Sequence, residues 1–362
     1  MAATLAWLAW AGLATADDDE IRAATLVRTD SDGTQVVSPS ARGRAQVLDE
    51  DTHFDVEYVA DVWTSASIDV RTAATLPVTE QRDEIDVGLD RRFEDVLVRG
   101  SYRYSAEHDY QSHGGTLSGS ADFADHNTTL ELRLTAQHDT IGRSGDPLFQ
   151  RPQTVFGGRA AYTQVIDPNM LVQAAYELVR VEGFQSSPYR FVGIGGDGRC
   201  AGTAQLCVPE THPDARTRHA IVVRARRALD DQLSLHADYR FYADDWGLLA
   251  HTAAVQASWM HDERGLFALR YRFHDQGAAA FYRSSYPMPT FTLLYASRDR
   301  ELSPLTSHRV SLAYEREFEL GEAGPPLRVA VALGGTALDY HDFVGLSQVL
   351  AGDATLSLSV EL

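Results

Sequence analysis

Short segments in which apolar and polar side chains alternate recur along most of this chain. The pattern is clearest in four segments, 128–137, 232–243, 265–274 and 354–362. In the first of them, leucines at alternate positions are separated by Glu131, Arg133 and Thr135. Alternation with a period of two puts one set of side chains on each face of a β-strand. The sequence therefore predicts an all-β fold whose strands have one apolar face and one charged face.

The connections between these segments alternate between short and long. Short acidic turns are separated by long connections at 138–153, 183–215, 275–305 and 339–353. Tight turns at one end and long loops at the other are typical of an up-and-down antiparallel transmembrane β-barrel, with periplasmic turns and extracellular loops. We expect sixteen strands, at 21–28, 42–49, 54–63, 84–93, 96–105, 114–124, 128–137, 154–166, 170–182, 216–229, 232–243, 248–260, 265–274, 306–318, 327–338 and 354–362. Fourteen strands is the alternative, because Asp30 to Gly33 and Pro39 interrupt the first region.

The charged face must line the inside of such a barrel. An arginine that faces lipid costs roughly 2–4 kcal/mol at the middle of the bilayer, whereas an arginine in the lumen meets water or a carboxylate. Six arginines occupy the same alternate positions of their strands as polar neighbours do. We expect these six to form a charge network in the lumen: Arg133, Arg224, Arg226, Arg240, Arg270 and Arg272.

Composition limits the partners of the chain. Acidic residues number 51 against 32 basic ones, which gives a net charge of −19 and argues against nucleic-acid binding. A hydrophobic fraction of 44% excludes a disordered chain, and no apolar run reaches the ~20 residues that a membrane-spanning helix needs. The lipid of the bacterial outer membrane is the expected partner. No cofactor motif is recognised in the sequence.

The first residues are typical of an export signal. An apolar stretch from Leu5 to Ala14 ends in an A-x-A sequence and an acidic run. We expect a signal peptide over 1–16, an N-terminal segment with one strand over 17–41, and the barrel over 42–362. A short buried helix at the start is the alternative, since the first four residues carry no positive charge.

Two cysteines lie seven positions apart in a glycine-rich stretch. In an oxidising compartment Cys200 and Cys207 can close a local loop as a disulfide, and in a reducing one they would be free thiols. We expect the disulfide, because export places the chain outside the cytosol.

Several polar stretches stand out from the alternating pattern. They include YSAEHDYQS at 104–112, PYR at 188–190, YRFYADDWGLLAHT at 239–252, RYRFHDQGAAAFY at 270–282 and YASRDRELSPLTSHRVSL at 295–312. In this order they resemble an uncharacterised family of predicted outer-membrane β-barrels, a domain of unknown function. The resemblance implies the fold and the location over nearly the whole mature chain. It also suggests periplasmic or lipoprotein partners in a redox-associated system.

Carboxylates and histidines gather at the expected strand ends. Asp244, Asp245 and His251 could bind a cation, although their spacing matches no known metal motif. The alternative is a structural network in which Asp244, Asp245 and Asp299 pair with lumen arginines. We expect the network.

Three functions remain open at this stage. A porin-like channel is the first, because a barrel of sixteen strands can enclose an aqueous lumen. The second is a barrel plugged by the loops at 183–215 and 275–305 that acts as a scaffold in an envelope complex. An outer-membrane enzyme is the weakest, since the sequence has no G-x-S-x-G motif and Ser307-His308 carries no nucleophile signal.

Overall fold

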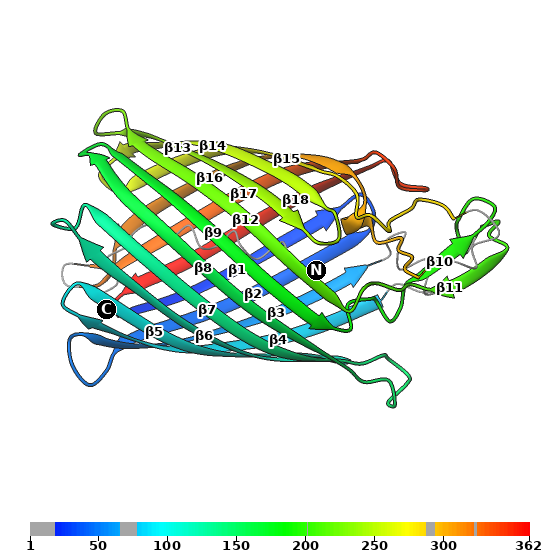
Figure 1. The fold of residues 1–362 in the computed structure, drawn as a ribbon. Helices are drawn as coiled ribbons and strands as arrows, with labels where there is room; N and C mark the ends of the chain where they lie inside the picture. The colour runs from blue at the N-terminus through cyan, green and yellow to red at the C-terminus, as the bar shows by residue number, and fades with distance from the viewer. Residues whose placement is uncertain (1–18, 66–77, 201, 287–293, 322–323) are drawn as a thin grey trace.

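A closed antiparallel barrel of sixteen strands forms the body of the molecule (Figure 1). The computed structural model describes residues 19–65, 78–200, 202–286, 294–321 and 324–362, so the expected signal peptide lies outside the described residues. The barrel strands are β1 (Glu20–Asp30), β2 (Thr34–Gln46), β3 (Thr52–Ser65), β4 (Val78–Phe93), β5 (Val96–Glu107), β6 (Tyr110–Phe123), β7 (Thr128–Ile141), β8 (Arg151–Asp167), β9 (Met170–Gly183), β12 (Ala215–Ala228), β13 (Leu233–Asp244), β14 (Leu249–Asp262), β15 (Gly265–Gln276), β16 (Leu305–Glu319), β17 (Pro326–Tyr340) and β18 (Gln348–Glu361).

Each strand pairs with the strands that precede and follow it in the barrel, and β1 closes the sheet against β18. Closure leaves no unpaired edge, which is the condition for a sheet to stand in hydrocarbon. The predicted count of sixteen is confirmed. Among the described residues, no helix is long and apolar enough to span a membrane.

The two ends of the barrel differ in the length of their connections. We call the end with the long connections the loop end and the other the turn end. The loop end includes 142–150, 184–214, 277–304 and 341–347. Figure 1 shows the longest connections and their small two-stranded sheet beyond the right end of the barrel, with the C-terminus at the left end.

The first hairpin corrects the expected strand positions. The second strand covers 34–46 rather than 42–49, so the barrel begins at Glu20. The expected interruption is a tight turn, in which Asp30 Oδ1 accepts the N–H groups of Asp32 and Thr34 and Gly33 adopts a φ of +85°. Pro39 lies inside β2, where it has no N–H to donate and leaves a gap in the pairing with β3.

The outer face of the barrel is apolar. Leu132, Leu269, Val310 and Leu333 are among the many large hydrophobic side chains exposed there. In a membrane these side chains meet lipid, which accounts for an otherwise unfavourable exposed surface.

Tyrosine–histidine pairs mark one level of this outer face. In four hairpins that close at the loop end, a tyrosine on the first strand bonds the Nδ1 of a histidine on the second. The pairs are Tyr102–His113 (2.7 Å), Tyr176–His219 (2.7 Å), Tyr239–His251 (2.6 Å) and Tyr271–His308 (2.8 Å). All four pairs have the same register. On the neighbouring strand, the residue directly opposite the tyrosine is the one that follows the histidine by two positions. Side chains with an apolar ring and a polar tip belong at the boundary between hydrocarbon and headgroups.

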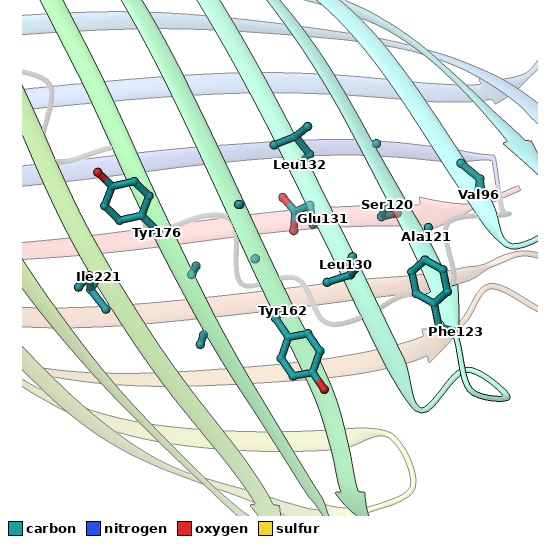
Figure 2. Close-up of a pocket in the computed structure, with 15 residues that line it drawn as sticks. Val96, Ser120, Ala121, Phe123, Leu130, Glu131, Leu132, Tyr162, Tyr176 and Ile221 are labelled. Carbon is teal, nitrogen blue, oxygen red and sulfur yellow. The ribbon is translucent and has the colours of Figure 1, made fainter.

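A hollow interrupts the outer face over β6 to β9 (Figure 2). It has a volume of about 750 Å³, and small residues at Gly119, Ala121, Ala160 and Ala174 are among those that line it. Leu132, which is exposed to the outside, lies beside them. An apolar hollow on a lipid-facing wall suits acyl chains rather than a polar solute, so the candidate site lies elsewhere.

Candidate functional site

Two loops at the loop end fold onto each other and form a cap. We define the loop cap as the described parts of 184–214 and 277–304. The first loop contains a small sheet of β10 (Phe191–Ile194) and β11 (Leu206–Pro209), and the second contains the short 3-10 helix η1 (Arg300–Leu302). Val192, Ile194, Tyr286 and Ala296 form an apolar cluster between the two loops. The predicted disulfide is present: Cys200 is bonded to Cys207 within the first loop.

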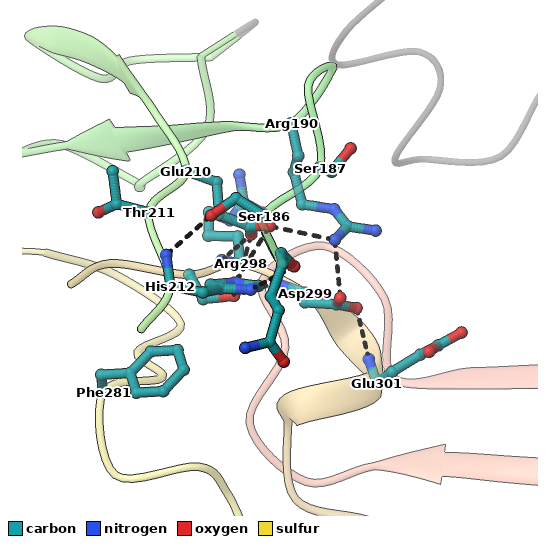
Figure 3. A network of polar contacts seen from close by, with 12 residues as sticks. Ser186, Ser187, Arg190, Glu210, Thr211, His212, Phe281, Arg298, Asp299 and Glu301 are labelled. Atoms are coloured by element: carbon teal, nitrogen blue, oxygen red, sulfur yellow. Dashed lines mark hydrogen bonds and ion pairs between the residues drawn. The ribbon is translucent and has the colours of Figure 1, made fainter. Parts of the chain in front are cut away.

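Glu210 is the centre of the polar contacts in the loop cap (Figure 3). Its side chain is 0% exposed and accepts hydrogen bonds from Ser297 Oγ (2.9 Å) and the backbone N–H of Arg298 (3.1 Å). His212 Nε2 and Arg190 Nη1 lie 3.2 Å and 3.3 Å from Glu210 Oε1. A buried carboxylate is stable only when its oxygens are paired in this way. Glu210 therefore holds the two loops together as an anion.

The contacts of Glu210 also set its protonation. Burial raises the pKa of Glu210, but the hydrogen bond with His212 and the positive charge of Arg190 outweigh burial and lower the pKa to about 2. The group stays ionised at any pH that a cell envelope normally meets.

Glu210, His212 and Ser297 are also the three residue types of a hydrolase triad, but their arrangement differs from one. Ser297 Oγ is hydrogen-bonded to His212 Nε2 at 2.9 Å but also donates to Glu210, and His212 Nδ1 is hydrogen-bonded to the carbonyl of Gln185 at 3.0 Å rather than to a carboxylate. In a triad the carboxylate orients the histidine from the side opposite the serine. Ser297 is moreover 0% exposed, which leaves no room for a substrate. The cluster is built as a structural clamp.

The loop cap reaches across the mouth of the barrel. Tyr189 Oη is hydrogen-bonded to Asp109 in the β5–β6 turn, and the next residue, Arg190, lies 2.8 Å from Asp299 in the β15–β16 loop. Eight hairpins close at the loop end. The β5–β6 and β15–β16 hairpins are four places apart in this ring, so they lie on opposite sides of the mouth. In the same β15–β16 loop, Arg300 forms an ion pair with Asp32 of the β1–β2 turn at 2.9 Å.

An aromatic cluster anchors the loop cap to the rim. Trp246 is 5% exposed and packs at a 5.1 Å centroid distance from Phe281 and 5.3 Å from His212. Its indole N–H donates to the carbonyl of Ala215. The guanidinium of Arg216 lies 4.2 Å from the ring centroid, a cation–π geometry.

Asp244 positions this tryptophan. The carboxylate of Asp244 accepts the N–H groups of Trp246 and Leu248, each at 3.0 Å, and pairs with the guanidinium of Arg216. The ADDWG stretch of the sequence is thus a tight rim turn that presents Trp246 to the loop cap.

Below the loop cap, the lumen wall carries a series of ion pairs. Arg159 Nη1 lies 2.6 Å from Glu131, and Arg240 Nη2 lies 3.0 Å from Glu177. Further along, Arg270 pairs with Asp238 at 2.6 Å. A similar cluster towards the turn end joins Arg44 to Asp90 at 2.7 Å. The expected charged inner face is therefore observed, and register brings its charges together.

Lumen side chains remain accessible to water. The side chain of Arg133 is 51% exposed and that of Arg240 is 43% exposed, although both point inward by alternation with the apolar outer face. Water therefore reaches these two arginines on the inner face of the barrel.

The structure distributes the predicted site residues over separate contacts. Arg133 lies 3.5 Å from Glu131, Arg224 donates to Gln173 at 3.0 Å, and Arg226 faces the lumen opposite His236. We expected Asp244, Asp245 and Asp299 to pair with the lumen arginines in one network. Instead the three carboxylates lie on the rim and in the loop cap, and their arginine partners are Arg216, Arg180 and Arg190.

The candidate metal ligands are not brought together. Asp244 pairs with Arg216, and Asp245 accepts the N–H of Thr217 at 2.9 Å. His251 lies on the outer face and bonds Tyr239. Within the part of the chain that the structure describes, no group of three or more His, Cys, Asp or Glu side chains could hold a metal ion.

Several important residues were missed by sequence reasoning. Glu177 and Asp238 share the inward parity of the arginines, so alternation could have found them once the strand register was known. Glu210 and His212 lie in an irregular loop and meet Ser297 across more than eighty residues. No local pattern in the sequence reports such a contact.

Comparisons with known proteins agree with this architecture. The family described as protein of unknown function (DUF3570) matches residues 70–156 and 150–324. A search among curated proteins found no match to this sequence. Among solved structures, a bacterial polysaccharide outer membrane secretin is similar with a TM-score of 0.54 at 11% identity, covering 96% of this chain and 99% of that one. OprD of Pseudomonas aeruginosa has a TM-score of 0.42 at 9% identity, covering 95% of each chain. At 11% identity the likeness to the secretin shows the fold alone.

Proposed function

Since the chain belongs to the DUF3570 family and is a sixteen-stranded barrel of the outer-membrane type, we propose that it is a porin-like channel whose mouth is covered by the loop cap. In this proposal the barrel spans the bacterial outer membrane and the loop end faces outside, as long loops do in such barrels. The solute crosses the lumen, and the loop cap controls entry.

One observation carries the proposal. Charged side chains halfway along the strands, Arg133 and Arg240 above all, point inward and are about half exposed to water. A plugged barrel would cover such groups, because it fills its lumen with protein. A barrel of this strand number has room for an aqueous passage.

A second function has its own support. Tyr189, Arg190 and Arg300 connect opposite sides of the mouth, which favours a barrel closed from outside that serves as a scaffold for periplasmic or lipoprotein partners. An enzyme has weaker support, since Ser297 is enclosed in the clamp.

Osmotic swelling of proteoliposomes separates the two functions. Purified, refolded protein is reconstituted and exposed to a series of sugars of increasing size. A channel gives swelling rates that fall with the size of the sugar. A scaffold gives the rate of protein-free liposomes for every sugar, and that result would overturn the proposal.

A further inference from the structure

The middle of the lumen wall over β7 to β16 carries an excess of arginine. Eight arginines point inward there and form what we call the arginine belt: Arg133, Arg159, Arg224, Arg226, Arg240, Arg270, Arg272 and Arg309. Three inward carboxylates lie among them, Glu131, Glu177 and Asp238. With Asp353 of β18, which pairs with Arg309, eight positive charges stand against four negative ones, so this wall is positive although the whole chain has a net charge of −19.

Two details show that the belt is more than a set of ion pairs. Arg272 and Arg309 occupy directly opposed positions on β15 and β16, an arrangement that costs free energy through like-charge repulsion. Asp353 pairs with Arg309 at 2.7 Å. Arg224 and Arg226 are exposed to the lumen, and the hydrogen-bond partner of Arg224 is the neutral side chain of Gln173.

On the wall across the lumen, carboxylates and arginines stand side by side: Arg42 is opposite Glu57, and Arg103 is opposite Asp86. On β3 and β4, Glu57 lies directly opposite Asp86, and Glu84 is nearby. These three carboxylates line a recess of about 190 Å³ together with hydroxyl groups of Ser38 and Ser40. Around the ring of sixteen strands, β3 lies eight places from β13, and β4 lies eight places from β14. The two walls therefore face each other across the lumen. The arginine belt therefore makes one side of the lumen the more positive one, and low-dielectric walls strengthen its field.

We propose that the lumen selects small anionic solutes, bearing a carboxylate or phosphate group, which cross along the arginine belt. This inference rests on the proposed channel function and names the solute class of that channel. Arginine is suited to the task, because its planar fork binds carboxylate and phosphate oxygens in pairs. A row of such groups at successive positions allows an anion to pass from one to the next.

Reversal potentials in planar bilayers test the proposal. The protein is placed between unequal KCl solutions, and the ratio of chloride to potassium permeability is calculated from the potential at zero current. We expect a ratio above one. The Arg224→Gln/Arg226→Gln variant should lower the ratio by about tenfold for each charge removed. One unit charge acting through water on an ion roughly 6 Å away changes its permeability by about threefold, and chloride and potassium change in opposite directions.

Two further variants make the test specific. Arg227→Gln is the matched control, because Arg227 follows Arg226 on the same strand and points outward; its ratio should equal that of the unaltered protein. Glu57→Gln removes a charge from the opposite wall and should raise the ratio. Heat-modifiable migration on gels establishes that each variant is folded.

The outcomes separate this inference from the proposed function. A conducting barrel that prefers potassium, or whose ratio does not change in Arg224→Gln/Arg226→Gln, overturns anion selection and leaves the channel function in place. Folded protein that never conducts overturns the channel function, and anion selection with it.

Discussion

Arg190 Nη1 lies 2.8 Å from Asp299 Oδ2 and 3.3 Å from Glu210 Oε1, so one guanidinium joins two loops that arise from separate parts of the barrel. Its neighbour Tyr189 is hydrogen-bonded to Asp109 on the opposite rim. The loop cap is therefore held over the mouth by charged and polar contacts around a small apolar cluster. Such contacts respond to pH and to single substitutions, and the predictions below use both.

The first prediction concerns acid. Glu210 has a pKa of about 2 in the folded cap against an ordinary value of 4.5, so its ionised form stabilises the cap. This stabilisation, about 3 kcal/mol, is complete above pH 4.5 and is lost as the pH falls towards 2. Hydrogen exchange of 184–214 should therefore accelerate between pH 4.5 and 2, after correction for the intrinsic rate.

The control for the acid prediction is the Glu210→Gln variant, whose side chain at this position cannot ionise. Its loop cap should exchange faster at pH 7 and show little further acceleration in acid. An identical pH response in this variant and in the unaltered protein would show that another group holds the cap closed.

The second prediction concerns the faces of the barrel. Leu132 is exposed on the outer face, and Thr135 lies on the inner face of the same strand. Leu132→Arg should destabilise the barrel in lipid by roughly 2–4 kcal/mol, because the charge enters hydrocarbon, whereas Thr135→Arg places it in the lumen. Unfolding in urea, followed by heat-modifiable migration on gels, measures the difference. Equal losses of the folded form in the two variants would contradict the strand register.

The third prediction concerns the disulfide. Cys207 lies in β11 and Cys200 lies in the connection between β10 and β11, so the bond closes a short loop within the loop cap. Unreduced exported protein should give a peptide spanning both cysteines that is two hydrogens lighter than the reduced one. Cys207→Ser should speed hydrogen exchange in 191–209 and leave the barrel strands unchanged. Slower refolding or faster exchange of the barrel itself would show that the bond has a wider role.

The barrel could be predicted from sequence because its signal is local. Alternation such as that of 128–137 fixes which face each side chain takes, and the inward arginines, Arg240 among them, followed directly. The predicted position of the second strand was wrong, because a proline was expected to interrupt it. Pro39 is accommodated within β2, since its missing N–H leaves only a small gap in the pairing with β3.

The loop cap could not be predicted in the same way. The contact of Glu210 with Ser297 depends on two loops that meet only after the barrel has closed. The stretches at 188–190, 239–252 and 295–312 were recognised as unusual, and the structure brings parts of all three together at the mouth. Their partners were missed because pairing between loops is not periodic.

Single-channel recording of Arg190→Ala tests the central claim most directly. The substitution removes the link between Asp299 and Glu210, and the cap should open more often. Arg199→Ala is the matched control, because Arg199 lies in the same loop and pairs with Asp197, two positions before it. We predict brief, infrequent openings for the unaltered protein and for Arg199→Ala, and long openings of full conductance for Arg190→Ala. Folded Arg190→Ala protein that conducts no more than the unaltered protein would contradict a water-filled channel closed by its loop cap.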